Sequence, residues 1–173
     1  MRCHILFYEV LQTPFILIGS ILLLDIVSDI ISKLKNPEEC ATLEKNALER
    51  GDPGLAIQAR KQGIAMRAQA HGATTDAERA CLEAVYAYER VLSEQRRRTT
   101  RASRTWQMIK RHGIIGAAER AVNRTTETTG YRALVEMGLE EYAFEAVILR
   151  YPQVFSAEAI KRSRQRLIEN TNA

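Results

Sequence analysis

The chain contains few of the residues that interrupt helices or crosslink a fold. Its 173 residues include four prolines, nine glycines and three cysteines. So few prolines and glycines favour long helices. The cysteines are odd in number and show no CxxC spacing, so neither a disulfide framework nor a zinc knuckle is indicated. This cysteine usage fits a reducing, cytoplasmic setting; the three residues are Cys3, Cys40 and Cys81.

Signatures of catalysis and of cofactor binding are also absent. The three histidines lie far apart, and none has Cys, Asp or Glu near it at metal-ligand spacing. There is no glycine-rich phosphate loop and no Gly-x-Ser-x-Gly nucleophile motif. His71 and His112 each precede a glycine at a predicted helix end, where an imidazole is favourable near the last carbonyls. We therefore predict a non-enzymatic protein without a metal or a cofactor, although a site assembled from distant residues would leave no such signature.

Extended strands are not indicated either. No run of alternating β-branched residues is long enough to form one. The composition, with 46% hydrophobic and 27% charged residues, is typical of a globular protein. Apolar residues recur at helical spacing along the chain. The sequence therefore predicts an all-α fold, an antiparallel bundle of about seven to nine helices.

Helix-start and helix-stop signals divide the first half of the chain. The motif NPEE at residues 36–39 combines a capping side chain, a proline for the first turn and a glutamate that reaches back. This helix should end at Arg50, before Gly51, and Asp52-Pro53 starts the next one, which ends near residue 71. So short a turn predicts an antiparallel hairpin over residues 36–71, similar to a tetratricopeptide hairpin, although no period of about 34 residues continues.

The remaining helices are predicted from similar signals. Thr75 and Glu78 form a second capping box before a core-facing helix, and Ser103 is expected to cap the next helix. Further helices are expected over residues 103–111 and 114–124, from Thr128 or Thr129 to Gly138, from Leu139 to Tyr151 before Pro152, and after the cap Ser156. The predicted organisation has four parts: an apolar segment over residues 1–24, a helical subdomain over 25–95, a basic connector over 96–104 and a second helical subdomain over 105–173.

Residues 1–24 are apolar but do not match a membrane span. Their longest uninterrupted run, Pro14 to Leu24, has 11 residues, whereas a spanning helix needs about 20. A cleaved signal is poorly supported because Arg2 supplies the only positive charge before the apolar run. Three interpretations stay open: a buried or partner-covered helix, a membrane anchor through residues 5–24, and an extension outside the folded unit. We predict a cytoplasmic protein, with N-terminal membrane anchoring as the alternative.

Positive charge gathers in the second half of the chain. Residues 1–94 carry 10 Lys/Arg against 13 Asp/Glu and residues 95–173 carry 15 against 8, so the net charges are −3 and +7. Five arginines lie within residues 96–104, directly before Trp106, the single tryptophan. Such a basic surface favours a polyanionic partner, DNA or RNA. The residues predicted to contact nucleic acid are Arg96, Arg97, Arg98, Arg101, Arg104, Lys110, Arg111, Arg120, Asn123 and Arg124.

Two hypotheses follow for this basic half. In the first, the helices 103–111 and 114–124 form a helix-turn-helix-like pair hinged at Gly113, with Trp106 on the inner face and the basic residues contacting phosphate. In the second, the arginines are a solvated surface that pairs with the acidic first half, and Trp106 is a core anchor. The protein would then be a protein-interaction adaptor whose hairpin over residues 36–71 presents a groove.

Three segments carry a resemblance to a family. They are NPEECATLEKNALERGDPGLAIQARK, RASRTWQMIKRHGIIGAAERAVNR and TTGYRALVEMGLEEYAFEAVILRYPQVFS. On these segments, residues 28–168 resemble a family of small uncharacterised bacterial proteins. The resemblance leaves the apolar N-terminal segment outside, implies a bacterial or phage origin, and implies no activity, cofactor or catalytic residue.

Overall fold

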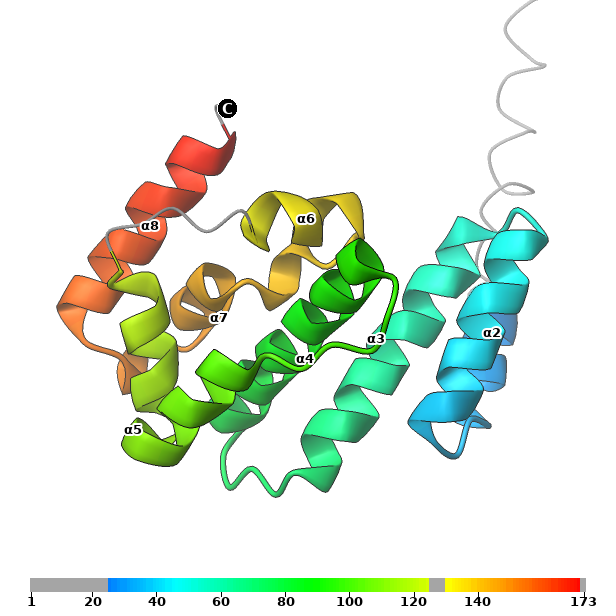
Figure 1. Ribbon diagram of the computed structural model, residues 1–173, viewed down its shortest axis with the longest axis horizontal. Coiled ribbons are helices and arrows are strands. Elements are labelled where there is room, and N and C mark those ends of the chain that lie inside the picture. The colour runs from blue at the N-terminus through cyan, green and yellow to red at the C-terminus, as the bar shows by residue number, and fades with distance from the viewer. Residues whose placement is uncertain (1–24, 125–129, 172–173) are drawn as a thin grey trace, which may run out of the picture. The chain divides into compact units, whose positions relative to one another are not determined.

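The computed structural model describes residues 25–124 and 130–171, and within them the chain is all-helical. It has eight α-helices, of which the first covers residues 25–32. The others are α2 (Pro37–Glu49), α3 (Pro53–Ala70), α4 (Asp76–Arg96), α5 (Ser103–Val122), α6 (Gly130–Glu136), α7 (Phe144–Arg150) and α8 (Ala157–Thr171). Two short 3-10 helices, η1 (Glu140–Tyr142) and η2 (Pro152–Val154), flank α7 (Figure 1). No β-strand occurs in these residues, so the predicted all-α class with seven to nine helices is confirmed.

The predictions for residues 1–24, and the helix start at Thr128 or Thr129, lie outside the described residues. Among the helices of the described residues, none combines the length and the apolar character that a bilayer crossing requires.

The described residues form two compact units, divided between Ala59 and Arg60. The division falls inside α3, whereas the sequence predicted subdomains separated by a connector at 96–104. The reason is that α4 shares its core with α5, α7 and α8, so the helices on both sides of the connector belong to one unit. Helix α3 belongs partly to each unit. For the predicted hairpin over residues 36–71, the structure therefore confirms only where its two helices begin and end.

The predicted helix starts at residues 36 and 75 are confirmed. Asn36 Oδ1 accepts from the amide of Glu39 at 2.8 Å, and Thr75 Oγ1 accepts from the amide of Glu78 at 3.2 Å. Each glutamate also accepts a backbone N–H one residue before the cap, from Lys35 and Thr74 respectively, both at 2.9 Å or less. The hydrogen bonds from Thr74 hold the pKa of Glu78 below its usual range. Both starts are therefore fixed by local side chains.

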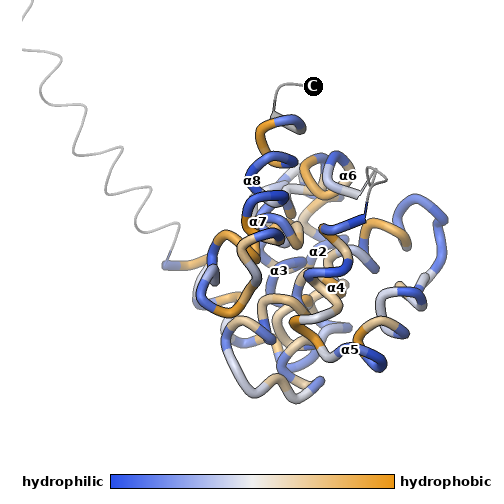
Figure 2. Tube along the Cα trace, turned by 90° about the vertical axis from the view of Figure 1, so that its left-hand side faces the viewer, coloured by the Kyte–Doolittle hydropathy of each residue, from blue (hydrophilic) through white to orange (hydrophobic). Residues whose placement is uncertain are grey.

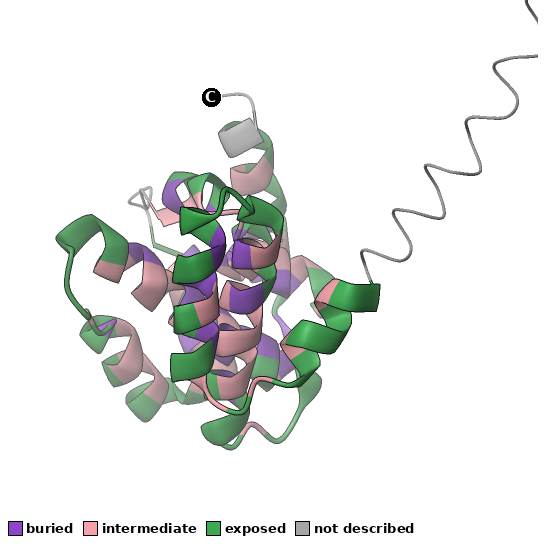
Figure 3. Ribbon diagram, turned by 90° about the vertical axis from the view of Figure 1, so that its right-hand side faces the viewer, coloured by how far each residue is buried: buried purple, intermediate pink, exposed green. Residues whose placement is uncertain are grey.

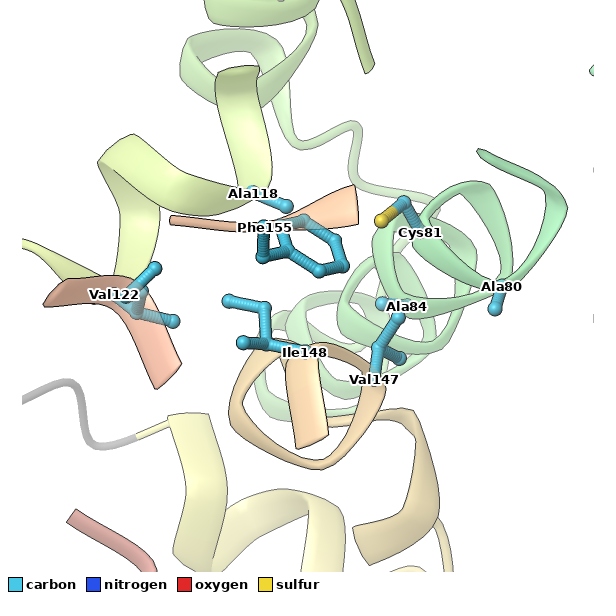
Figure 4. Packing of buried hydrophobic residues seen from close by; sticks show 9 residues of the cluster. Ala80, Cys81, Ala84, Ala118, Val122, Val147, Ile148 and Phe155 are labelled. Atoms are coloured by element: carbon cyan, nitrogen blue, oxygen red, sulfur yellow. The ribbon is translucent and has the colours of Figure 1, made fainter. Parts of the chain in front are cut away.

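Helix α4 is the centre of the second unit, because both of its core clusters include residues of this helix. Buried residues follow one side of the helices and exposed residues the other (Figure 3). The first cluster joins α4, α5, α7 and α8 and contains Ala80, Cys81, Ala84, Ala118, Val122, Val147, Ile148, Phe155 and Ala159 (Figure 4). The second joins α3, α4 and α6 and contains Ile64, Ala87, Val91, Ala133, Leu134, Leu139 and Ala143. Burial raises the pKa of the Cys81 thiol to about 12, so Cys81 is a protonated core residue.

The predicted single helix from Leu139 to Tyr151 is wrong. Ala143 has extended backbone angles, φ −62° and ψ 141°, and separates η1 from α7. Leu139 and Ala143 pack in the second cluster, whereas Val147 and Ile148 pack in the first. The break therefore turns the chain from one core cluster to the other, which is a long-range requirement that a helical periodicity does not reveal.

An ion pair that is almost excluded from solvent joins α7 to α8. Arg166 Nη1 lies 3.1 Å from Glu145 Oε1, and the two side chains are only 13% and 11% exposed. The same guanidinium donates to the carbonyl of Arg124, just after the end of α5. Arg166 therefore links three parts of the second unit: α7, α8 and the end of α5.

We expect Arg166→Met to lower the free energy of unfolding by about 3 kcal/mol, because it leaves the carboxylate of Glu145 buried without its partner. Arg164→Met is the matched control, since Arg164 is exposed on the same helix and should cost less than about 0.5 kcal/mol. Chemical denaturation of the full chain measures both changes. Equal losses in the two variants would contradict a structural role for the buried pair.

Candidate nucleic-acid interface

The basic connector is a folded turn that packs back onto the end of α4. Helix α4 ends at Arg96, and Arg97 follows in the left-handed conformation, with φ 51°. The amide of Arg98 then donates to the carbonyl of Ser93 at 3.2 Å, and the amide of Thr100 donates to Ser93 Oγ at 2.9 Å. Figure 2 shows this hydrophilic stretch between α4 and α5. The arginines are thus carried on backbone that is fixed to α4.

The carboxylate of Glu89 closes this turn. A single oxygen, Oε1, accepts from the backbone N–H of Ala102 at 2.9 Å and from the indole Nε1–H of Trp106 at 2.6 Å. The prediction that Ser103 caps the next helix is wrong, because Ala102 occupies the cap position and its side chain makes no capping bond. A carboxylate from α4 thus fixes the start of α5, where a local cap was expected.

Three aromatic rings from three elements meet beside this turn. The rings of His71 and Trp106 stack, with centroids 4.7 Å apart and an interplanar angle of 29°. Tyr86 packs edge-on against Trp106 at 5.5 Å, and its hydroxyl lies 3.3 Å from Nδ1 of His71. Burial and then the charge of Glu89 raise the pKa of Tyr86, so its hydroxyl stays protonated at neutral pH. We call His71, Tyr86 and Trp106 the aromatic cluster.

Helix α5 has the predicted break at Gly113. This residue has φ 72° and ψ 173°, and it is the only residue inside α5 with non-helical backbone angles. Ala118 and Val122 lie on the buried face, while Trp106, which was predicted on the inner face, is half-buried. A DNA-binding helix-turn-helix joins its helices by a turn of three to four residues. The joint in α5 is one residue long, so α5 is a kinked helix that follows the surface of the unit.

All ten residues predicted to contact nucleic acid are exposed. Within residues 60–124 and 130–171, none of their side chains forms an ion pair with an acidic side chain. Two of them contact other side chains of the unit. The guanidinium of Arg101 lies 5.3 Å from the centre of the Trp106 ring, and Arg124 Nη2 lies 3.2 Å from Sδ of Met108.

Five of the ten residues predicted to contact nucleic acid line one or both of two cavities. The first, of about 460 Å³, lies among α4, α5, α6 and α7 and is lined by Arg96, Arg101, Arg104 and Arg124, with Tyr88, Met108, Tyr131 and Phe144 among its other walls. The second, of about 480 Å³, is lined by His71, Arg101, Ser103, Trp106, Gln107, Ile109 and Lys110. We call these the arginine cavity and the aromatic cavity. The other five predicted residues, Arg97, Arg98, Arg111, Arg120 and Asn123, line neither.

Sequence reasoning missed three residues that shape this surface, His71, Tyr86 and Glu89. His71 was interpreted as a helix-end residue, and neither Tyr86 nor Glu89 was predicted as a site residue. His71 follows the end of α3, and Tyr86 and Glu89 lie within α4, 17 to 35 positions before Trp106. No short-range spacing connects them, so only the fold brings them together.

Comparison with known proteins yields no relative: no family model, no curated protein and no solved structure matches the chain. The resemblance to a bacterial family therefore stays a prediction.

We expect Arg97→Gly to raise the free energy of unfolding by about 0.5–1 kcal/mol, because glycine occupies the left-handed region without the strain of a side chain. Among the described residues, Arg97 is the only non-glycine residue with a positive φ. Arg98→Gly, at a position of negative φ, is the matched control and should not stabilise the chain. Denaturation curves that show no gain for Arg97→Gly would contradict this interpretation of the turn.

Glu89→Ala should lower the free energy of unfolding by about 2 kcal/mol, because it leaves two donors without their common acceptor. The emission of Trp106 should shift to longer wavelength as the indole becomes more solvated. Glu94→Ala, at an exposed position of the same helix, is the control and should leave both readouts unchanged. If the Trp106 emission of Glu89→Ala also stays unchanged, the carboxylate does not hold the indole in place.

Proposed function

We propose that the second unit binds nucleic acid, contacting phosphate through the exposed basic side chains of the turn after α4 and of α5. The observation that carries the proposal is the arginine cavity. Four arginines, Arg96, Arg101, Arg104 and Arg124, line one cavity. The single acidic residue in its lining, Glu145, is already paired with Arg166.

Charge separation between the two units supports this proposal. Residues 1–59 carry 5 Lys/Arg against 8 Asp/Glu and residues 60–173 carry 20 against 13, so the net charges are −3 and +7. These net charges equal those of the two sequence halves because residues 60–94 carry 5 Lys/Arg against 5 Asp/Glu. Gathering like charges without counterions is unfavourable, and a polyanion relieves that repulsion.

The chemistry of the cations favours phosphate. Guanidinium groups donate two parallel hydrogen bonds to phosphate oxygens, and charge-assisted bonds of this kind are stronger than neutral ones. The turn that carries them is fixed by Ser93 and Glu89, so little backbone ordering accompanies binding. Phosphate contacts position a protein without reading sequence, so we expect binding of similar strength to unrelated sequences.

The combined variant Arg96→Ala, Arg104→Ala and Arg124→Ala tests the phosphate contacts. Fluorescence anisotropy with labelled single-stranded and duplex oligonucleotides, at several salt concentrations, measures the affinity. The slope of log affinity against log salt should become shallower by about two for single strands, because each lost phosphate contact contributes about 0.7.

The matched control removes three exposed lysines of the first unit, Lys33, Lys35 and Lys45, and should leave the slope unchanged. An unchanged slope in the arginine variant, or an equal change in the lysine variant, would contradict the proposed interface. Absence of binding by the unaltered chain at low salt would overturn the proposed function itself.

A further inference from the structure

The aromatic cavity combines aromatic rings that stack on each other with exposed cations. His71 and Trp106 supply stacked ring surface, and the exposed cations Arg101 and Lys110 are the charged groups of its lining. Ser103 and Gln107 add a hydroxyl and an amide, and no Asp or Glu lines the cavity. The cavity has a volume of about 480 Å³ and is wide open to solvent.

We propose that the aromatic cavity takes one unpaired nucleobase of a single-stranded nucleic acid. Because His71 and Trp106 stack on each other, the base packs on the outer ring face that His71 presents, while Arg101 and Lys110 contact the phosphates on either side. This inference rests on the proposed function, because it names the form of nucleic acid that the same surface recognises.

The pairing of rings with cations favours a single strand over a duplex. In a duplex both faces of each base are covered by neighbouring bases, whereas an unpaired base presents a free face to an aromatic side chain. Sites for single strands combine such stacking surfaces with cations that follow the backbone. The alternative, a helix-turn-helix placed in a duplex groove, lacks support because the joint of α5 is the single residue Gly113.

The ring surface is held in place before any ligand binds. The indole of Trp106 is fixed by its 2.6 Å hydrogen bond to Glu89, and His71 is supported by the hydroxyl of Tyr86 at 3.3 Å. Immobilising flexible side chains weakens binding, so rings that are already ordered strengthen it. Gln107 and Ser103 offer donors and acceptors to the edge of a stacked base.

Trp106 is the single tryptophan of the chain, so its fluorescence reports directly on the cavity. The experiment compares oligothymidylate of about eight nucleotides with an abasic oligomer of the same length, which keeps the phosphates and lacks the bases. With the full chain, oligothymidylate should bind about tenfold more tightly than the abasic oligomer. Oligothymidylate should also quench Trp106, whereas the abasic oligomer should not.

The outcomes separate the two proposals. Equal affinities and no quenching by oligothymidylate would overturn base stacking and leave phosphate binding intact. No binding of either oligomer at low salt would overturn both proposals.

Variants of His71 test the stacking without removing the reporter. His71→Ala should abolish the tenfold preference for oligothymidylate and keep the affinity for the abasic oligomer, whereas His71→Phe should retain the preference because a phenyl ring also stacks. His112→Ala is the matched control, since His112 is an exposed histidine that lines neither cavity. Identical preferences in His71→Ala and His112→Ala would overturn the assignment of His71.

Discussion

The carboxylate of Glu89 is the interaction on which the rest of the surface depends. One oxygen accepts from the backbone at Ala102 and from the indole of Trp106, so it fixes the start of α5 and the orientation of the ring together. Without it, the turn after α4 would have no anchor beyond Ser93, and the arginines on it would lose their common position. A charged acceptor is suited to this task because hydrogen bonds to ionised groups are stronger than neutral ones.

Helix α4 organises both the core of the second unit and its basic surface. Helix α4 contributes to both core clusters with one side and, through Glu89 and Ser93, fixes the basic turn that follows it. The kink at Gly113 lets the second half of α5 pack Ala118 and Val122 into the core. The first half of α5 and the turn before it carry residues that line both cavities, and Arg101 and Ser103 line both of them.

Helix caps, ends and breaks that depend on neighbouring residues could be predicted from the sequence. The packing of segments that are distant in the sequence could not. The caps at Asn36 and Thr75, the helix end at Gly51 and the break at Gly113 each depend on neighbouring residues, and all four were predicted. The break at Ala143 and the division inside α3 depend on which core each segment joins. Charge composition and the predicted helix pair 103–111 and 114–124 indicated the ten exposed residues, whereas the grouping of Trp106 with residues of two other elements required the fold.

The central claim is that the basic turn and the first half of α5 meet nucleic acid, and an NMR titration tests it most directly. A uniformly ¹⁵N-labelled chain would be titrated with a short single-stranded oligonucleotide, and shifts of backbone amides, arginine Nε–H groups and the Trp106 indole would be followed. The account predicts the largest changes at residues 96–111 and at the indole. Largest changes in residues 25–59 or in α8, or no changes at low salt, would contradict it.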